Sequence, residues 1–129
     1  MGPVTVRYIV DDVDTAIAFY RDLLGFDEVM HPAPSFAMLA YDDLRLALSA
    51  PSTRGGGGQA MSDGTVPAPG GWNRFSLPVD DLDRVVATTD EAGVHRRSEI
   101  IDGIAGRQVL IDDPSGNPVE LFEAYESEH

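Results

Sequence analysis

Residues 10–14 read Val-Asp-Asp-Val-Asp, and residues 79–83 repeat this pattern as Val-Asp-Asp-Leu-Asp. A second pair of segments matches in the same order, since Leu-Ala-Tyr-Asp-Asp at 39–43 corresponds to Val-Leu-Ile-Asp-Asp at 109–113. Nearly the same length of chain separates the members of each pair, which chance rarely produces. The sequence therefore predicts two copies of one structural module, and such a repeat has to be identified before a fold is assigned.

Each copy begins with a predicted strand and a predicted helix. Apolar residues alternate in the strand, as they do where one face of a sheet is buried. The alternating residues are Val4, Val6, Tyr8 and Val10 in the first copy, and Phe75, Leu77 and Val79 in the second. Asp12 and Asp81 are suited to cap the following helices. Gly25 and Gly93 lie where each helix is expected to end in a left-handed residue.

Three further strand-like stretches complete each copy. We expect them at about residues 26–31, 35–42 and 44–50, and at about 95–102, 106–113 and 117–123. Asp-Pro-Ser-Gly-Asn-Pro at 113–118 predicts a tight turn between the last two strands. The sequence thus predicts an α+β fold of two tandem βαβββ modules, which form a cupped mixed sheet with the helices on its outer face.

The two copies are joined by a segment rich in glycine and proline. We expect a single domain over residues 1–129, with module one at 3–50, a connector at 51–71 and module two at 72–126. A connector of this length is either a flexible linker or a lid over a site. The four-glycine run at 55–58 is no phosphate loop, because neither Lys-Ser nor Lys-Thr follows it.

Composition and charge exclude several classes of function. The 129 residues carry 9 Lys+Arg against 22 Asp+Glu, a net charge of −13, which disfavours nucleic acid and anionic membranes as partners. Cysteine is absent, so disulfides and thiolate chemistry are excluded. No apolar run approaches the roughly 20 residues of a membrane span, and the N-terminus does not have the pattern of a signal peptide. We therefore expect a cytoplasmic protein.

The duplicated module resembles the vicinal oxygen chelate superfamily, which contains glyoxalases, extradiol dioxygenases, fosfomycin-resistance enzymes and bleomycin-resistance proteins. The resemblance rests on Val-Asp-Asp-Val-Asp at 10–14 and Ala-Phe-Tyr-Arg-Asp-Leu-Leu-Gly-Phe at 18–26. It rests also on the closing Asp-Asp-Pro-Ser-Gly-Asn-Pro-Val-Glu-Leu-Phe-Glu at 112–123. These motifs are specific for the fold and not for one activity.

Enzymes of that superfamily hold a divalent metal at four strand positions. The resemblance places these positions at Thr5, Ala47, Arg74 and Glu120, of which only Glu120 is a competent ligand. An ion pair between Arg74 and Glu120 is the better expectation. The three histidines, His31, His95 and His129, are expected on the surface or in loops. We therefore predict no metal and no cofactor.

The remaining candidates form a binding surface. Strand alternation places Arg7 and Arg74 on the faces opposite Tyr8 and Phe75. Further candidates are Phe36, Met38, Trp72 and Glu120. Two alternatives remain open: Trp72 is also compatible with a core position, and Arg74 with Glu120 is also compatible with an ion pair that meets no ligand.

The resemblance implies a metal-free homodimeric binder that sequesters a bulky, partly aromatic natural product, such as a bleomycin-, mitomycin- or enediyne-like antibiotic, and so gives resistance. Its partner is then a small molecule, and no residue is catalytic. The alternative is a glyoxalase-like lyase or isomerase, or another small-molecule enzyme of the same superfamily, with Glu120 as a possible general base. A third class is an accessory subunit without a small ligand.

Overall fold

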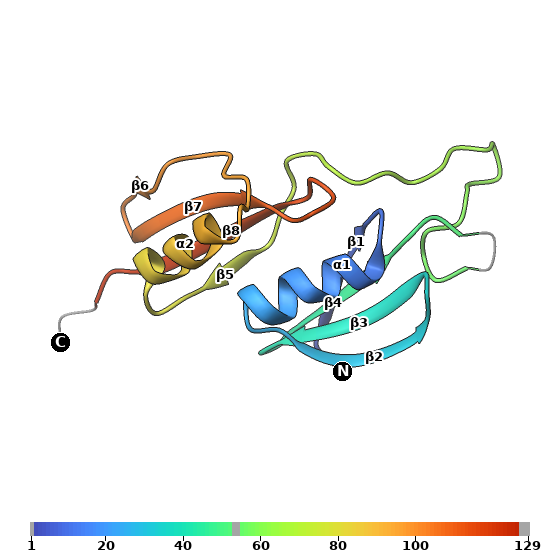
Figure 1. The fold of residues 1–129 in the computed structure, drawn as a ribbon, viewed down its shortest axis with the longest axis horizontal. Helices are drawn as coiled ribbons and strands as arrows, with labels where there is room; N and C mark the ends of the chain where they lie inside the picture. Colours follow the sequence, from blue (N-terminus) through green and yellow to red (C-terminus); the bar gives the residue numbers. More distant parts are fainter. Residues whose placement is uncertain (1, 53–54, 127–129) are drawn as a thin grey trace. The chain divides into compact units, whose positions relative to one another are not determined.

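The first module is a four-stranded sheet covered on one face by helix. The computed structural model describes residues 2–52 and 55–126. Strand β1 (Val4–Ile9) leads into α1 (Val13–Ala18), which continues as the π-helical turn η1 (Phe19–Leu23), and β2 (Asp27–Ala33), β3 (Phe36–Tyr41) and β4 (Leu44–Ser49) follow. Figure 1 shows these elements in the blue to green part of the chain. The strand order is β1-β4-β3-β2, with β1 and β4 parallel and the other pairs antiparallel.

The second module repeats this arrangement. Its strands are β5 (Ser76–Pro78), β6 (Ile101–Asp102), β7 (Gly106–Asp112) and β8 (Pro118–Ala124), and its helix is α2 (Leu82–Glu91). The order β5-β8-β7-β6 matches that of the first sheet, and β5 is again parallel to its neighbour (Figure 1). The predicted α+β fold of two βαβββ modules is confirmed, and each module forms its own four-stranded sheet.

The chain divides into two compact units. One consists of Met1–Gly70 with Pro114–Asn117, and the other of Gly71–Asp113 with Pro118–His129. In the first, α1 packs on β3 and β4, and its core includes Ile17, Tyr20, Leu39, Leu46 and Leu48. In the second, α2 packs on β8, and the core includes Leu77, Leu82, Val109, Ile111 and Leu121. None of the described helices has the length and apolar character needed to cross a bilayer.

The predicted helix boundaries are correct in both modules. Asp12 and Asp81 cap the two helices through their carboxylates, as N-cap residues do. Gly25 and Gly93 adopt the expected left-handed conformation, with φ angles of 82° and 79°. In the second module the amide of Val94 donates to the carbonyl of Thr89 and that of Gly93 to the carbonyl of Asp90, the two hydrogen bonds of a Schellman ending. In the first module the amide of Phe26 donates to the carbonyl of Tyr20, six residues back, across the wider π-helical turn.

One predicted strand is wrong in its length. We expected a strand at 95–102, whereas β6 consists only of Ile101 and Asp102, and Arg96 forms an isolated bridge to Ile111. The hydroxyl of Ser98 accepts a hydrogen bond from the amide of Leu110 at 3.0 Å. A side-chain oxygen thus takes a place that a backbone carbonyl occupies in a regular ladder, which interrupts the strand.

The turn between β7 and β8 belongs to the first unit. Gly116 has a φ of 83°, as the predicted tight turn requires. Asn117 is buried, and its amide nitrogen donates to the carbonyl of Ile9 at 2.7 Å. Its amide oxygen accepts from the backbone of Gly70 at 2.8 Å. One side chain therefore joins the end of β1 to the end of the connector.

Glycines 55–58 of the connector, here called the glycine strap, lie on the face of the first sheet opposite α1. The hydroxyl of Ser49 donates to the carbonyl of Gly56 at 2.6 Å. A Cβ on Gly57 would overlap the guanidinium of Arg7, and one on Gly58 would overlap the carbonyl oxygen of Ala50. The strap approaches the sheet this closely because it has no side chains.

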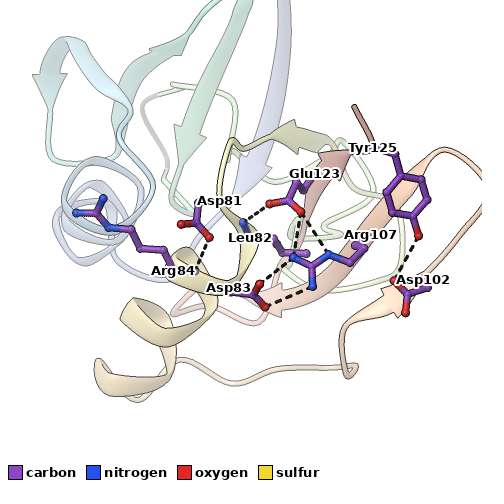
Figure 2. Close-up of polar contacts among 8 residues, drawn as sticks. All are labelled: Asp81, Leu82, Asp83, Arg84, Asp102, Arg107, Glu123 and Tyr125. Atoms are coloured by element: carbon purple, nitrogen blue, oxygen red, sulfur yellow. Dashed lines mark hydrogen bonds and ion pairs between the residues drawn. The ribbon is translucent and has the colours of Figure 1, made fainter. Parts of the chain in front are cut away.

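A polar network fastens the start of α2 to its sheet (Figure 2). The carboxylate of Glu123 accepts from the amide of Leu82 at 3.0 Å, a donor left free at the helix N-terminus. Arg107 donates to Glu123 and to Asp83, each at 3.0 Å. The Leu82 amide, followed by Arg107, lowers the pKa of the Glu123 carboxyl. The charged form of Glu123 is therefore favoured by folding.

We expect Glu123→Gln to lower the thermal unfolding temperature at pH 7. Since the folded-state pKa lies below the ordinary glutamate value of about 4.3, the contribution of Glu123 is fully present above that pH. It is lost as the pH falls through the lower folded-state pKa. Calorimetry from pH 7 to pH 3 should show the gap between wild type and Glu123→Gln closing in acid. Glu126→Gln removes an exposed carboxylate of the same strand end and should leave the profile unchanged; a constant gap at all pH values would contradict this account.

We expect Gly58→Ala to destabilise the protein by about 1–3 kcal/mol, because a methyl group would overlap backbone that cannot move aside easily. The matched control is Gly103→Ala. Gly103 also lacks a positive φ, and its Cβ would meet its nearest neighbour, the carbonyl oxygen of Gly106, at 3.4 Å. Urea unfolding of both variants measures the difference. Equal stabilities would show that the strap does not rest on the sheet.

Candidate ligand-binding site

Three of the predicted site residues lie together on the open face of the first sheet, the face opposite α1. Strand pairing aligns Arg7 with Ala47, and Ala47 with Met38. Phe36 lies two residues from Met38 and pairs with Ser49. Arg7 is exposed while its neighbour Tyr8 is buried, which confirms the predicted alternation. Arg7, Phe36 and Met38 thus share one face.

The open face combines apolar side chains with two guanidinium groups, those of Arg7 and Arg45, and Arg45 donates to the backbone carbonyls of Asp42 and Leu44. Phe36 and Met38 are half-buried, so each still offers part of its surface to solvent. Within the described ranges, no residue makes a hydrogen bond or ion pair with the guanidinium of Arg7. An apolar wall with one available donor group is a common composition for a small-molecule site.

A cavity adjoins Phe36. It has a volume of about 470 Å³ and lies between the β2–β3 hairpin and the start of the connector. Its lining consists of Pro32, Ala33, Pro34, Ser35, Phe36, Ser52, Gly55 and Gly56. The volume lies within the roughly 300–1,000 Å³ of typical ligand pockets. The sequence analysis predicted Phe36 here but not the prolines, whose role depends on the folded hairpin.

The other three predicted residues lie together in the second unit. Arg74 donates to one oxygen of Glu120 from Nη2 at 3.1 Å and from Nε at 3.3 Å, so the expected ion pair is present. Arg74 Nη1 also donates to the carbonyl of Trp72 at 3.3 Å. Trp72 is 67% exposed and is therefore not a core residue. The pair at Arg74 and Glu120 fixes the segment that enters β5.

Arg97 and Asp112, which the sequence did not indicate as site residues, lie beside Trp72. The guanidinium carbon of Arg97 lies 4.7 Å from the centroid of the indole ring, a cation–π contact. Nε of Arg97 donates to Asp112 at 2.6 Å. Arg97 and Asp112 lie in different segments from Trp72, and only the fold brings them together. No local sequence pattern could have indicated this cluster.

The four positions that correspond to metal ligands do not suit a metal. Thr5 and Ala47 offer at most one neutral hydroxyl, and Arg74 is a cation. Glu120 offers the one carboxylate, and Arg74 already holds one of its oxygens. His31 and His95 are exposed, and His129 lies outside the described residues. A metal centre wants three or more converging donors, which this set does not provide.

The comparisons with known proteins agree with this architecture. The family model described as Glyoxalase/Bleomycin resistance protein/Dioxygenase superfamily matches residues 2–121. A member of that superfamily from Sphaerobacter thermophilus DSM 20745 has 28% identity and a TM-score of 0.73, with 95% of this chain and 97% of that chain covered. No curated protein matches this chain significantly.

Two further solved structures are similar in fold. TnmS3, an antibiotic binding protein from Streptomyces sp. CB03234, has 24% identity and a TM-score of 0.72, with 97% of each chain covered. Lactoylglutathione lyase from Agrobacterium tumefaciens has 24% identity and a TM-score of 0.70, with 93% of this chain and 91% of that chain covered. These two support the fold alone. The duplicated βαβββ architecture and the family match over residues 2–121 together show that this chain belongs to the glyoxalase/bleomycin resistance protein/dioxygenase superfamily.

Proposed function

We propose that this protein binds a bulky, partly aromatic natural product without changing it chemically and without a metal ion, and that it protects against such a compound by sequestration. Bleomycin-, mitomycin- and enediyne-like antibiotics are the candidate ligands. TnmS3, whose fold is similar, is an antibiotic binding protein, which supports this choice of ligand class.

The main support for the proposal is the ion pair between Arg74 and Glu120. Glu120 is the one carboxylate at the four superfamily positions, and two nitrogens of Arg74 donate to the same oxygen. A carboxylate oxygen held in this way is less available to a metal ion, because the incoming cation competes with the guanidinium for it. The pair is better suited to binding polar groups than to catalysis.

The open face of the first sheet supports binding of an aromatic compound. Phe36 and Met38 supply apolar and polarisable contacts, and Arg7 supplies hydrogen-bond donors that the described residues leave available. The cavity beside Phe36 has room for part of a drug-sized molecule. We propose that Arg7, Phe36 and Met38 contact the ligand.

The second unit contributes a further set to this proposal. The exposed ring of Trp72 is available for stacking, and Arg74 and Glu120 offer a donor and an acceptor beside it. We propose that Trp72, Arg74 and Glu120 form a ligand-contacting set within the second unit. Aromatic side chains that are exposed and held in place are frequent binding hot spots.

We expect the purified protein to contain no stoichiometric divalent metal, and ligand binding to be unchanged by a chelator. The reason is the donor set at Thr5, Ala47, Arg74 and Glu120. Elemental analysis after mild purification measures the metal content. About one equivalent of metal that disappears in Glu120→Ala would contradict the proposal and would favour the lyase.

We expect at least one of bleomycin, mitomycin C and an enediyne to raise the thermal unfolding temperature. A ligand at 100 times its Kd stabilises by about 2.7 kcal/mol. Phe36→Ala should weaken that binding by roughly 1–3 kcal/mol, as loss of an aromatic anchor does. Val4→Ala is the control, because Val4 is 71% exposed and alternates onto the opposite face of β1.

The bound antibiotic should be recovered chemically unchanged after hours of incubation, as judged by mass spectrometry. A modified product formed only with active protein would instead identify an enzyme. Equal losses of affinity in Phe36→Ala and Val4→Ala would show that the open face is not the site.

A further inference from the structure

Trp72 is the one tryptophan of the chain, and its ring is exposed on the second unit although a charged side chain lies against it. The guanidinium carbon of Arg97 is 4.7 Å from the ring centroid, so the cation occupies one face of the indole. With 67% of the residue exposed, the remainder of the ring is available to a ligand. An exposed indole with one face occupied is a surface for stacking on the other face.

Arg97 is itself held firmly. Its Nε donates to Asp112 at 2.6 Å, its Nη1 donates to the carbonyl of Gly71 at 2.6 Å, and its backbone amide donates to the carbonyl of Leu110 at 2.8 Å. The side chain of Arg97 is only 15% exposed. The guanidinium therefore forms a fixed base beneath the ring.

The backbone on either side of the indole is held too. Arg97 binds the carbonyl of Gly71, and Arg74 donates to the carbonyl of Trp72 at 3.3 Å. Arg74 is in turn paired with Glu120. A ring fixed at its face and at its backbone loses little freedom when a ligand stacks on it, and preorganisation of this kind favours binding.

The cation also determines which rings stack well. The face of an indole carries negative potential, and a cation on one face draws on that potential. A second cation on the opposite face therefore gains less, whereas an electron-rich ring gains more from an indole polarised in this way. The protein as a whole, with a net charge of −13, attracts cations. At the Trp72 ring the effect is the opposite, because Arg97 makes the free face of the indole less favourable for a second cation.

We propose that Trp72 stacked on Arg97 is a binding platform for a planar, uncharged and electron-rich aromatic ring, with Arg97 as the positioning residue that sets this preference. The inference rests on the proposed function and makes it more specific, since it favours ligands with uncharged fused rings over cationic ones. Arg97 acts through the indole and does not itself contact the ligand.

The test uses two anthracene probes with the same ring system, one neutral and one cationic: 2-(hydroxymethyl)anthracene and the anthracen-2-ylmethylammonium ion. Emission of Trp72 responds to probe binding, because the chain has no other tryptophan, and the part of the calorimetric binding that is lost in Trp72→Ala is the binding at this ring. Titrations in 0.5 M NaCl screen the general attraction for the cation, since the Debye length is then only about 4 Å. Calorimetry in parallel measures total binding at any site.

We expect the neutral probe to quench Trp72 at a lower concentration than the cationic probe. Arg97→Ala should weaken binding of the neutral probe about 2- to 5-fold, the range expected for loss of one exposed cation–π contact beneath the ring. It should also reverse the preference, so that the cationic probe binds the ring better than the neutral one. General loosening of the structure would weaken both probes and would not reverse their order.

Arg96→Ala is the matched control. It removes the same charge from the adjacent position, but Arg96 pairs with Asp90 and Glu99 instead of Trp72. The inference is overturned if the cationic probe quenches wild type as well as the neutral one does, or if Arg97→Ala preserves the order. It is also overturned if calorimetry detects binding that leaves Trp72 emission unchanged.

The outcomes separate this inference from the proposed function. If antibiotic binding depends on Phe36 and neither anthracene probe changes the emission of Trp72, the proposed sequestration stands and the aromatic platform at Trp72 is refuted. If the neutral probe quenches Trp72 at a lower concentration than the cationic probe and no antibiotic binds, the aromatic platform stands and sequestration of an antibiotic is refuted as the function.

Discussion

A single helix can cover only one face of a four-stranded sheet, and each module of this chain has a single helical segment. In the first, α1 and η1 bury Tyr8, Leu39 and Leu46 against the sheet, and in the second α2 buries Leu77 and Leu121. Strand alternation then places every second residue on a face that no helix covers. The candidate binding residues are on these faces, and in the first module the glycine strap passes over part of that face.

The two modules share a backbone and differ in chemistry. Arg7 pairs with Ala47 in the first sheet, and Ser76 pairs with Glu120 at the corresponding place in the second. The register has therefore been kept while the side chains have diverged. Arg74 and Glu120 are partly shielded, with 29% and 16% of their side chains exposed, so removal of either partner would leave a charge in a position of reduced solvation.

The parts of this molecule that could be predicted from sequence are those decided by neighbouring residues. The alternation at Arg7 and Tyr8, the caps at Asp12 and Asp81, and the left-handed turns at Gly25 and Gly93 all follow from local conformational preferences. The superfamily motifs added the duplicated βαβββ fold, whereas the order of the strands within each sheet comes from the structure. Together they predicted the fold and placed Arg7, Phe36 and Met38 on one face.

The parts that could not be predicted depend on contacts between distant segments. Arg97 meets Trp72 through the fold, since the two residues are in segments that are separate in the sequence. The glycines at 55–58 indicated freedom of the backbone, whereas in the folded chain they permit close approach to Arg7 and Ala50. The composition of this segment shows which backbone conformations it can adopt, and its contacts with distant residues determine which one it adopts.

The position of Asn117 has a consequence for the order in which the protein can form during synthesis. Its side chain closes hydrogen bonds with Ile9 and Gly70, so the first compact unit needs a residue that is translated long after the unit's own strands. The carbonyl of Ile9 and the amide of Gly70 must therefore rely on water until that residue leaves the ribosome. The sequence consists of two successive copies of one module, but the hydrogen bonds of the first compact unit are complete only when most of the second copy has been synthesised. The first unit therefore cannot reach its final structure before Asn117 has left the ribosome.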